Sequence, residues 1–238
     1  MPDQRPPLLL TRPRAASERF ATEFRARFGK DWPVTIAPLI EIAALPAAVP
    51  KADAVIFTSE NAVAPFVAVS PPAGRRAYCV GGRTGKVAGA AGFEVISGPG
   101  DAVRLLPLIL AHHRAGSLVH ARGRHIAAPL ADQLNSAGIE TFEAVVYEQR
   151  DQPLAARAAV LLHGTGPVLV PLFSPRSAAL FAGFAQDSSA ELLLAPISAA
   201  AAAPCANLPR AALEQAERPE AASVLDALAR HLQKRVTG

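Results

Sequence analysis

Cysteine, tyrosine, tryptophan and methionine are scarce in this chain of 238 residues, which has two Cys, two Tyr, one Trp and one Met. Cys79 and Cys205 lie in apolar stretches and form no CxxC motif. We therefore expect two buried free thiols rather than a disulfide or a metal site. With so few aromatic rings, and a net charge of +4 that is not gathered in Lys or Arg runs, the composition favours small acidic molecules over nucleic acid as partners.

Long hydrophobic runs are also missing. The N-terminal apolar run, Leu8–Leu10, is three residues long and provides no signal-peptide core. The longest apolar stretch, Leu192–Ala206, is rich in alanine, interrupted by two prolines and too short to cross a bilayer. We expect a cytoplasmic protein without a membrane anchor.

The motifs of several functional classes are absent. There is no GxSxG nucleophile elbow, and no acidic cluster follows the first expected strand, as a receiver-like regulatory module would require. The histidines have no matched carboxylate or cysteine partners, so we expect no metal site. The segment Gly81–Gly85 resembles a glycine-rich phosphate loop but fits neither GxGxxG nor GxxxxGK[ST].

What the sequence does contain is a pattern that occurs twice. Ala54–Val63 is an apolar run that ends in hydroxyl residues and opens a helical pattern, and Leu169–Ala178 repeats it. Two further pairs of segments match in the same order. The offsets are 174 − 59 = 115, 198 − 81 = 117 and 122 − 12 = 110, for Ser59 with Ser174, Gly81 with Ser198, and Arg12 with Arg122. Three ordered matches at nearly one offset predict a diverged tandem duplication.

Strands and helices are expected to alternate in both halves. The expected strands are 8–11, 34–36, 54–57, 77–80, 118–120, 141–147, 168–172 and 192–197. The expected helices are 17–28, one from 62, one ending at 92, 126–137, 154–162, 177–184, an Ala-rich one after 197, and 220–235. This alternation predicts α/β architecture with parallel sheets covered by helices on both faces.

Ligands of such folds bind at the carboxyl ends of the strands, where helix N-termini present free amides. Thr58, Ser59, Gly81 and Ser174 all lie at this edge. The hydroxyls there are either helix caps or anion-binding groups, and the residues alone leave both readings open.

Two further residue types stand out. Arg12 and Arg122 occupy equivalent positions after strands and are either surface charges or partners for carboxylates. Tyr147 is not duplicated, because its counterpart at 147 − 107 = 40 is Ile40. This phenol serves either local packing or a specific polar task.

Six segments together carry a family resemblance. They are Leu8–Pro13, Phe57–Val63, Tyr78–Thr84, Ala121–Gly123, Val146–Glu148 and Phe173–Ala178. In their order and spacing they resemble the motifs of uroporphyrinogen-III synthases. One stretch departs from the family pattern, since Ser198–Ala201 lacks the Gly and Thr expected after the last strand, and one expected hydroxyl is therefore absent at Ala201.

The resemblance implies an architecture that differs from the one the duplication alone suggests. Instead of two contiguous halves divided near residue 115, it implies two flavodoxin-like, doubly wound α/β domains joined by a two-stranded linker. Residues 1–38 and 150–238 would form the first domain and 45–142 the second, with linker strands at 39–44 and 143–149.

The function implied is cyclisation of hydroxymethylbilane, with loss of water and inversion of ring D, to give uroporphyrinogen III for haem biosynthesis. The resemblance implies a monomer without cofactor or metal, a small-molecule substrate, and transient contact with the preceding pathway enzyme. Neither nucleic acid nor membrane is an expected partner. Tyr147 is the expected catalytic residue. Expected substrate-binding residues are Arg12, Thr58, Ser59, Asn61, Gly81, Thr84, Arg122, Ser174 and Ser177. The alternative is a non-catalytic two-domain α/β protein that binds a small anion.

Overall fold

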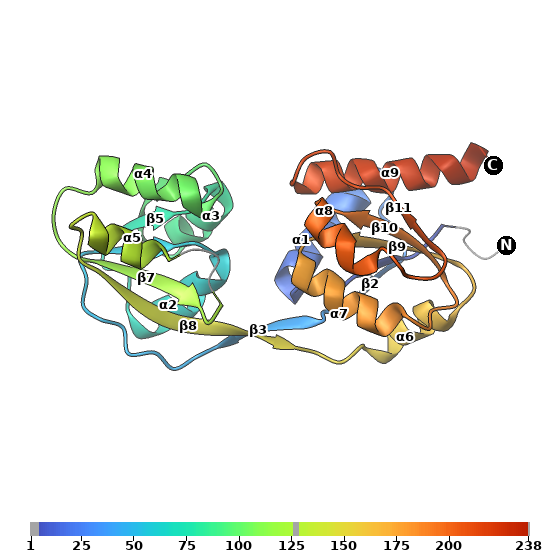
Figure 1. Cartoon of the computed structure of the whole chain (residues 1–238), viewed down its shortest axis with the longest axis horizontal. Helices are drawn as coiled ribbons and strands as arrows, with labels where there is room; N and C mark the ends of the chain where they lie inside the picture. The colour runs from blue at the N-terminus through green and yellow to red at the C-terminus, as the bar shows by residue number, and fades with distance from the viewer. Residues whose placement is uncertain (1–4, 126–128, 238) are drawn as a thin grey trace. The chain divides into compact units, whose positions relative to one another are not determined.

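The computed structural model describes residues 5–125 and 129–237. The chain forms two compact units. The first contains Met1–Glu41 and Asp151–Gly238, and the second contains Ile42–Arg150. The chain therefore passes from one unit to the other twice, as can be followed by colour in Figure 1.

The first unit contains a five-stranded sheet in the order β11-β10-β9-β1-β2, and all its neighbouring strands pair in parallel. The strands are β1 (Leu8–Leu10), β2 (Val34–Ile36), β9 (Pro167–Leu172), β10 (Glu191–Pro196) and β11 (Ala211–Leu213). The helices are α1 (Arg14–Phe28), α6 (Ala156–His163), α7 (Pro175–Ala185), α8 (Ala199–Ala202), the short 3-10 helix η2 (Ala203–Cys205) and α9 (Ala221–Thr237).

Helices cover both faces of this sheet (Figure 1). Leu9 packs in the core beneath α6 and α7, whereas Leu8 and Leu10 pack in the core beneath α1 and α9. Successive side chains of a strand point to opposite faces, so a strand covered on both sides must be apolar throughout. The uninterrupted Leu8–Leu10 run satisfies this requirement, and all three leucines are fully buried.

The second unit contains a six-stranded sheet in the order β3-β8-β7-β4-β5-β6. The strands are β3 (Ile40–Ala44), β4 (Ala54–Phe57), β5 (Arg76–Cys79), β6 (Glu94–Ser97), β7 (Leu118–Gly123) and β8 (Thr141–Asp151). The helices are η1 (Glu60–Ala62, a 3-10 turn), α2 (Val63–Val69), α3 (Gly82–Ala90), α4 (Ala102–His112) and α5 (Leu130–Ser136). One core lies beneath α2 and α3 and the other beneath α4 and α5. The predicted α/β class with parallel sheets is confirmed in both units.

The strand registers agree with the duplication. Leu8 of β1 pairs with Leu169 of β9, and Leu118 of β7 pairs with Ala54 of β4. These pairs are equivalent, because 118 − 8 = 110 and 169 − 54 = 115. The first repeat thus gives β1 and β2 to the first unit and β4–β6 to the second, while the second repeat gives β7 and β8 to the second unit and β9–β11 to the first.

Several element boundaries differ from those expected. The strands β6 and β11 were not among the expected elements, and α1 begins three residues early, at Arg14. The helix expected over 126–137 is α5, which begins at Leu130, directly after Pro129; residues 126–128 lie outside the described residues. The segments around the expected linkers form β3 and the long β8, which are neighbours at one edge of the sheet.

Phe57 provides a test of the second unit's core. Its ring is fully buried and meets those of Phe66 and Phe93 edge-on, at centroid distances of 5.5 Å and 5.3 Å. We expect Phe57→Ala to lower the free energy of unfolding by about 3–5 kcal/mol, because it leaves a cavity among these rings. Denaturant titration measures this loss. Val160→Ala, at a side chain 71% exposed, is the control and should change stability by less than about 0.5 kcal/mol. Equal effects of the two substitutions would contradict the packing described.

Candidate active site

Parallel pairing brings the carboxyl ends of the strands together along one edge of each sheet. In the second unit, Thr58 and Ser59 follow β4, and Gly81 lies two residues beyond the end of β5. In the first unit, Arg12 lies just beyond β1 and Ser174 just beyond β9. Most of the residues expected to bind substrate therefore lie at the carboxyl edge of their own sheet.

Ser59 caps the 3-10 turn η1. Its Oγ accepts a hydrogen bond from the backbone N–H of Asn61 at 3.2 Å. The interpretation of Ser59 as a cap is therefore correct, but it does not exclude a second role. A hydroxyl that accepts one hydrogen bond still has a proton to donate, for example to a carboxylate.

Gly81 adopts an extended conformation before α3, and no side chain caps the first amides of this helix. A Cβ atom at Gly81 would come within 3.1 Å of the Gly100 Cα, so the two backbones approach closely here. Thr84, in the first turn of α3, is buried. A helix start with uncapped amides and a partial positive charge suits an anion.

The first unit has a corresponding arrangement at α7. Ser174 caps the helix, accepting from the Ser177 N–H at 3.1 Å, and the two hydroxyls lie 2.8 Å apart. The Arg12 guanidinium lies over the Phe173 ring, 3.8 Å from its centroid, in a cation–π contact.

The next strand of the first unit lacks the hydroxyl of its counterpart. Ser198 caps α8 by accepting from the Ala201 N–H at 3.3 Å. Ala201 is fully buried at the position equivalent to Thr84, since 201 − 84 = 117. The two units therefore differ in the hydroxyls they present at this edge.

Tyr147 is held by a glycine on the neighbouring strand. A register shift near the end of β7 pairs Gly123 with Tyr147. A Cβ atom at Gly123 would come within 2.7 Å of the tyrosine Cζ, so the ring lies directly against the glycine backbone. Tyr147 is buried, and its hydroxyl-bearing end is the part of the ring closest to Gly123.

A polar cluster that was not predicted from the sequence lies beside Thr58. The Nε2 of His120 lies 3.0 Å from the Thr58 hydroxyl oxygen, and its Nδ1 lies 3.8 Å from a carboxylate oxygen of Glu143. Arg122 donates to the other Glu143 oxygen at 2.7 Å and to the Gly123 carbonyl at 2.9 Å. Arg122 is thus strongly engaged with protein groups, which weakens its case as a substrate-binding residue.

Burial is the main cause of the shifted pKa of His120. Removal from water lowers its pKa to about 4, the Glu143 carboxylate opposes this shift, and the Arg122 charge reinforces it. His120 is therefore neutral at pH 7. In the sequence it is one of several scattered histidines, yet the duplication offsets contained a signal, because its equivalent is the apolar Leu10.

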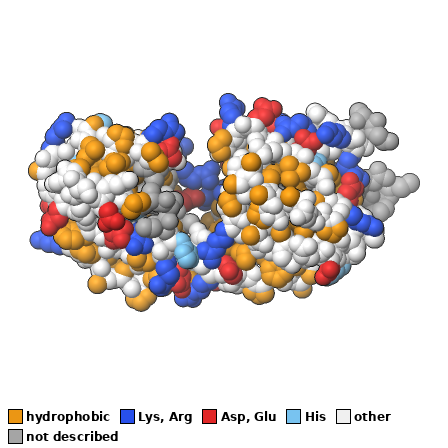
Figure 2. Space-filling view, viewed as in Figure 1, with side chains coloured by type: hydrophobic (Ala, Val, Ile, Leu, Met, Phe, Trp, Pro, Cys, Tyr) orange, Lys and Arg blue, Asp and Glu red, His pale blue; other side chains and the backbone are white. Residues whose placement is uncertain are grey.

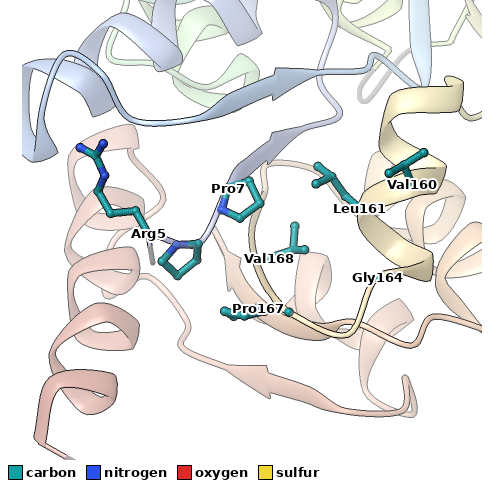
Figure 3. A pocket seen from close by; sticks show the side chains of 9 residues that line it. Arg5, Pro7, Val160, Leu161, Gly164, Pro167 and Val168 are labelled. Carbon is teal, nitrogen blue, oxygen red and sulfur yellow. The ribbon is translucent and has the colours of Figure 1, made fainter. Parts of the chain in front are cut away.

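The first unit also has a pocket of about 300 Å³ at the other edge of its sheet. Figure 3 shows Pro7, which precedes β1, together with Pro167 and Val168 at the start of β9 and with Val160 and Leu161 of α6. The pocket thus lies at the amino ends of these strands, away from Arg12 and Ser174.

Two absences apply to the described residues. Within 5–125 and 129–237, no three His, Cys, Asp or Glu side chains are grouped so that they could hold a metal ion. No helix in this part of the chain is both long and apolar enough to cross a membrane.

Comparison with known proteins identifies the family. The model of the family described as uroporphyrinogen-III synthase HemD matches residues 18–226. The chain belongs to the uroporphyrinogen-III synthase family. No curated protein matches it.

Two solved structures of uroporphyrinogen-III synthases resemble the chain. The crystal structure of uroporphyrinogen-III synthetase from Helicobacter pylori has a TM-score of 0.65 and 20% identity, covering 96% of this chain and 99% of that one. A mutant uroporphyrinogen III synthase from the extremely thermophilic bacterium Thermus thermophilus has a TM-score of 0.49 and 16% identity, with coverage of 96% and 99%. The Helicobacter pylori structure shows that the two proteins share a fold.

The shifted pKa of His120 predicts a pH-dependent stability. The folded protein binds this proton only near pH 4, whereas the unfolded chain binds it near pH 6.5. Above pH 6.5 the imidazole is neutral in both the folded and the unfolded state. As the pH falls from 6.5 towards 4, the unfolded chain gains a proton that the folded protein does not bind, so the free energy of unfolding decreases. The loss due to this group is about 3 kcal/mol.

Urea titrations of wild type and His120→Gln between pH 7 and 4 measure this effect. We expect the stability of the wild type to fall more steeply, because glutamine does not titrate. The paired design is needed because the pKa of His231 is also lowered by burial, and both proteins share that contribution. Parallel stability curves would contradict the assignment.

Proposed function

We propose that this chain converts hydroxymethylbilane to uroporphyrinogen III, with loss of water and inversion of ring D. The observation that carries the proposal is the family match over residues 18–226. Hydroxyls at the carboxyl edges of both sheets and the uncapped amides at the start of α3 support it. We also propose that the protein acts as a cytoplasmic monomer.

The chemistry requires positioning rather than a strong nucleophile. The substrate loses its hydroxyl group as water, which leaves an electrophilic azafulvene at ring A. The substituted carbon of ring D attacks this centre, and the resulting spiro intermediate rearranges and closes the inverted ring. The linear substrate can also close without inversion, so the enzyme must hold it in the productive shape. The electrophile arises from the substrate itself, and the proposal therefore includes neither cofactor nor metal.

Groups that donate hydrogen bonds suit the eight carboxylates of this substrate. In the second unit these are the Ser59 hydroxyl, the side chain of Asn61, and the start of α3 with Gly81 and Thr84. In the first unit they are Arg12, Ser174 and Ser177. Thr58 and Arg122 are weaker carboxylate ligands in this proposal because both already contact the cluster around His120.

Tyr147 is assigned to the departing hydroxyl group. A phenol can donate its proton to the leaving oxygen as water forms. The contact with Gly123 holds the ring in one orientation, which general acid catalysis requires. The absence of an equivalent phenol in the other repeat matches a substrate with only one leaving hydroxyl.

The partners proposed are few. Because free hydroxymethylbilane can close without inversion, transient contact with the enzyme that produces it would limit the wrong product. Basic and acidic side chains lie interspersed on the face shown in Figure 2, which agrees with a small-molecule substrate rather than nucleic acid or a membrane surface.

The decisive experiment supplies hydroxymethylbilane to the purified, metal-free protein and separates the uroporphyrinogen isomers. We expect predominantly type III product without added metal or cofactor, formed faster than spontaneous closure. Type I product alone, at the spontaneous rate, would exclude the proposed activity and leave the non-catalytic anion-binding protein as the better interpretation.

Substitution of Tyr147 tests its catalytic role. Tyr147→Phe keeps the ring against Gly123 and removes only the hydroxyl, so kcat should fall by about 10²-fold with little change in the unfolding midpoint. Ser59→Ala and Thr84→Ala are the matched controls. Each removes one of many carboxylate contacts and should cost about 1 kcal/mol in kcat/KM. Unchanged turnover and isomer ratio in Tyr147→Phe would assign Tyr147 to packing only.

A further inference from the structure

The cluster around His120 exists in only one of the two repeats. His120 of β7 pairs in register with Glu143 of β8. The equivalent pair in the first unit is Leu10 with Ile36, since 120 − 10 = 110 and 143 − 36 = 107. The same place in the fold is thus apolar in one unit and polar in the other.

Thr58, the third polar residue of the cluster, also has an apolar equivalent in the first unit. Thr58 contacts His120, and its equivalent at 58 + 115 = 173 is Phe173. Phe173 packs edge-on against Phe20 and carries the Arg12 guanidinium on its ring. The fold therefore does not need polar groups here, and burying an imidazole costs stability unless its hydrogen bonds serve a purpose.

The surroundings of His120 determine which nitrogen carries its proton. The side chain is 3% exposed and neutral, so one nitrogen donates and the other accepts. The Nδ1 is buried and, among the described residues, has no hydrogen-bond partner, but it faces a Glu143 oxygen 3.8 Å away. The carboxylate attracts a proton on Nδ1 and would repel a lone pair there. Arg122 donates to the other oxygen of this carboxylate, not to the oxygen that faces Nδ1.

The tautomer in turn fixes the direction of the hydrogen bond to Thr58. With the proton on Nδ1, the Nε2 can only accept, so the hydroxyl proton of Thr58 is donated to it across 3.0 Å. The Thr58 oxygen then keeps its lone pairs for another partner and has no proton left to donate. Such an oxygen can accept a hydrogen bond from an N–H group but cannot bind a carboxylate.

We propose that His120 is a positioning residue that holds the Thr58 hydroxyl as a hydrogen-bond acceptor for a pyrrole N–H of the tetrapyrrole substrate. This inference rests on the proposed function for the identity of the ligand. It gives Thr58 and Ser59 different roles, because the Ser59 hydroxyl keeps a proton that it can donate to a carboxylate. Two adjacent hydroxyls thus recognise different parts of one substrate.

The first experiment determines the tautomer in the substrate-free protein. The six histidines are labelled with ¹⁵N on the ring, and His120 is assigned by the signals missing from His120→Gln. At pH 7 we expect a protonated Nδ1 and an unprotonated Nε2. A proton on Nε2, or on both nitrogens, would overturn the proposal whatever the enzyme's activity.

The second experiment measures kcat/KM in a double-mutant cycle. Thr58→Val keeps the shape and removes the acceptor, and His120→Leu, which introduces the residue found at position 10, releases the hydroxyl. We expect each to lower kcat/KM about fivefold, and the double variant to be no worse than Thr58→Val. Thr58→Ser should keep most of the activity.

Two further variants distinguish a positioning role of His120 from a role in folding only. His120→Gln offers an amide oxygen to the Thr58 hydroxyl, so its kcat/KM should recover towards the wild-type value. His163→Gln, at an exposed position on α6, should leave kcat/KM unchanged. Additive losses in the cycle, or no rescue by glutamine in a folded variant, would overturn the proposal. If the wild type formed only type I product, the proposed function would fail, while the tautomer would still be decided by the first experiment.

Discussion

Parallel pairing of the strands is the constraint on which the rest of the structure depends. Because β4 pairs in parallel with both β5 and β7, the segments that follow these strands all emerge at one edge of the sheet. Ser59 and Gly81 reach this edge at the starts of η1 and α3, and Arg122 reaches it near the end of β7. The parallel arrangement also requires helices on both faces, which explains why β1, β4 and β9 are apolar throughout.

Much of this architecture could be predicted from the sequence, because long buried strands and capped helices leave strong local patterns. The strand Ala54–Phe57 and the hydroxyl cap Ser59 are examples, and both lie where the pattern predicts them. The strand β11 was missed because three residues, Ala211–Leu213, are too short and too weakly β-forming to be recognised without their partner β10. Strand β11 forms because it pairs with β10, and this tertiary contact cannot be predicted from the local sequence pattern.

The candidate site was predictable only in part, for a related reason. Hydroxyls at helix starts can be read from one segment of the sequence, but the cluster around His120 is assembled from β7, β8 and the residue that follows β4. Thr58 and His120 are 62 positions apart, and Glu143 joins them only through the pairing of β7 with β8. A single histidine among several scattered ones carries no sign of these partners in the sequence and is expected to be a surface or capping residue. Likewise, Gly123 explains the fixed ring of Tyr147 only when the register between the two strands is given.

The double passage of the chain between the units has a consequence for synthesis on the ribosome. All strands of the second unit's sheet from β4 to β8 lie within one continuous segment, so their pairing can begin once that segment has emerged. In the first unit, β1 must wait for β9, because Leu8 pairs with Leu169 after 169 − 8 = 161 further residues. Contacts of such long sequence separation close slowly. Strand β1, apolar on both faces, therefore remains without its partner β9 until most of the protein has been made. During this interval its apolar surface is open to aggregation.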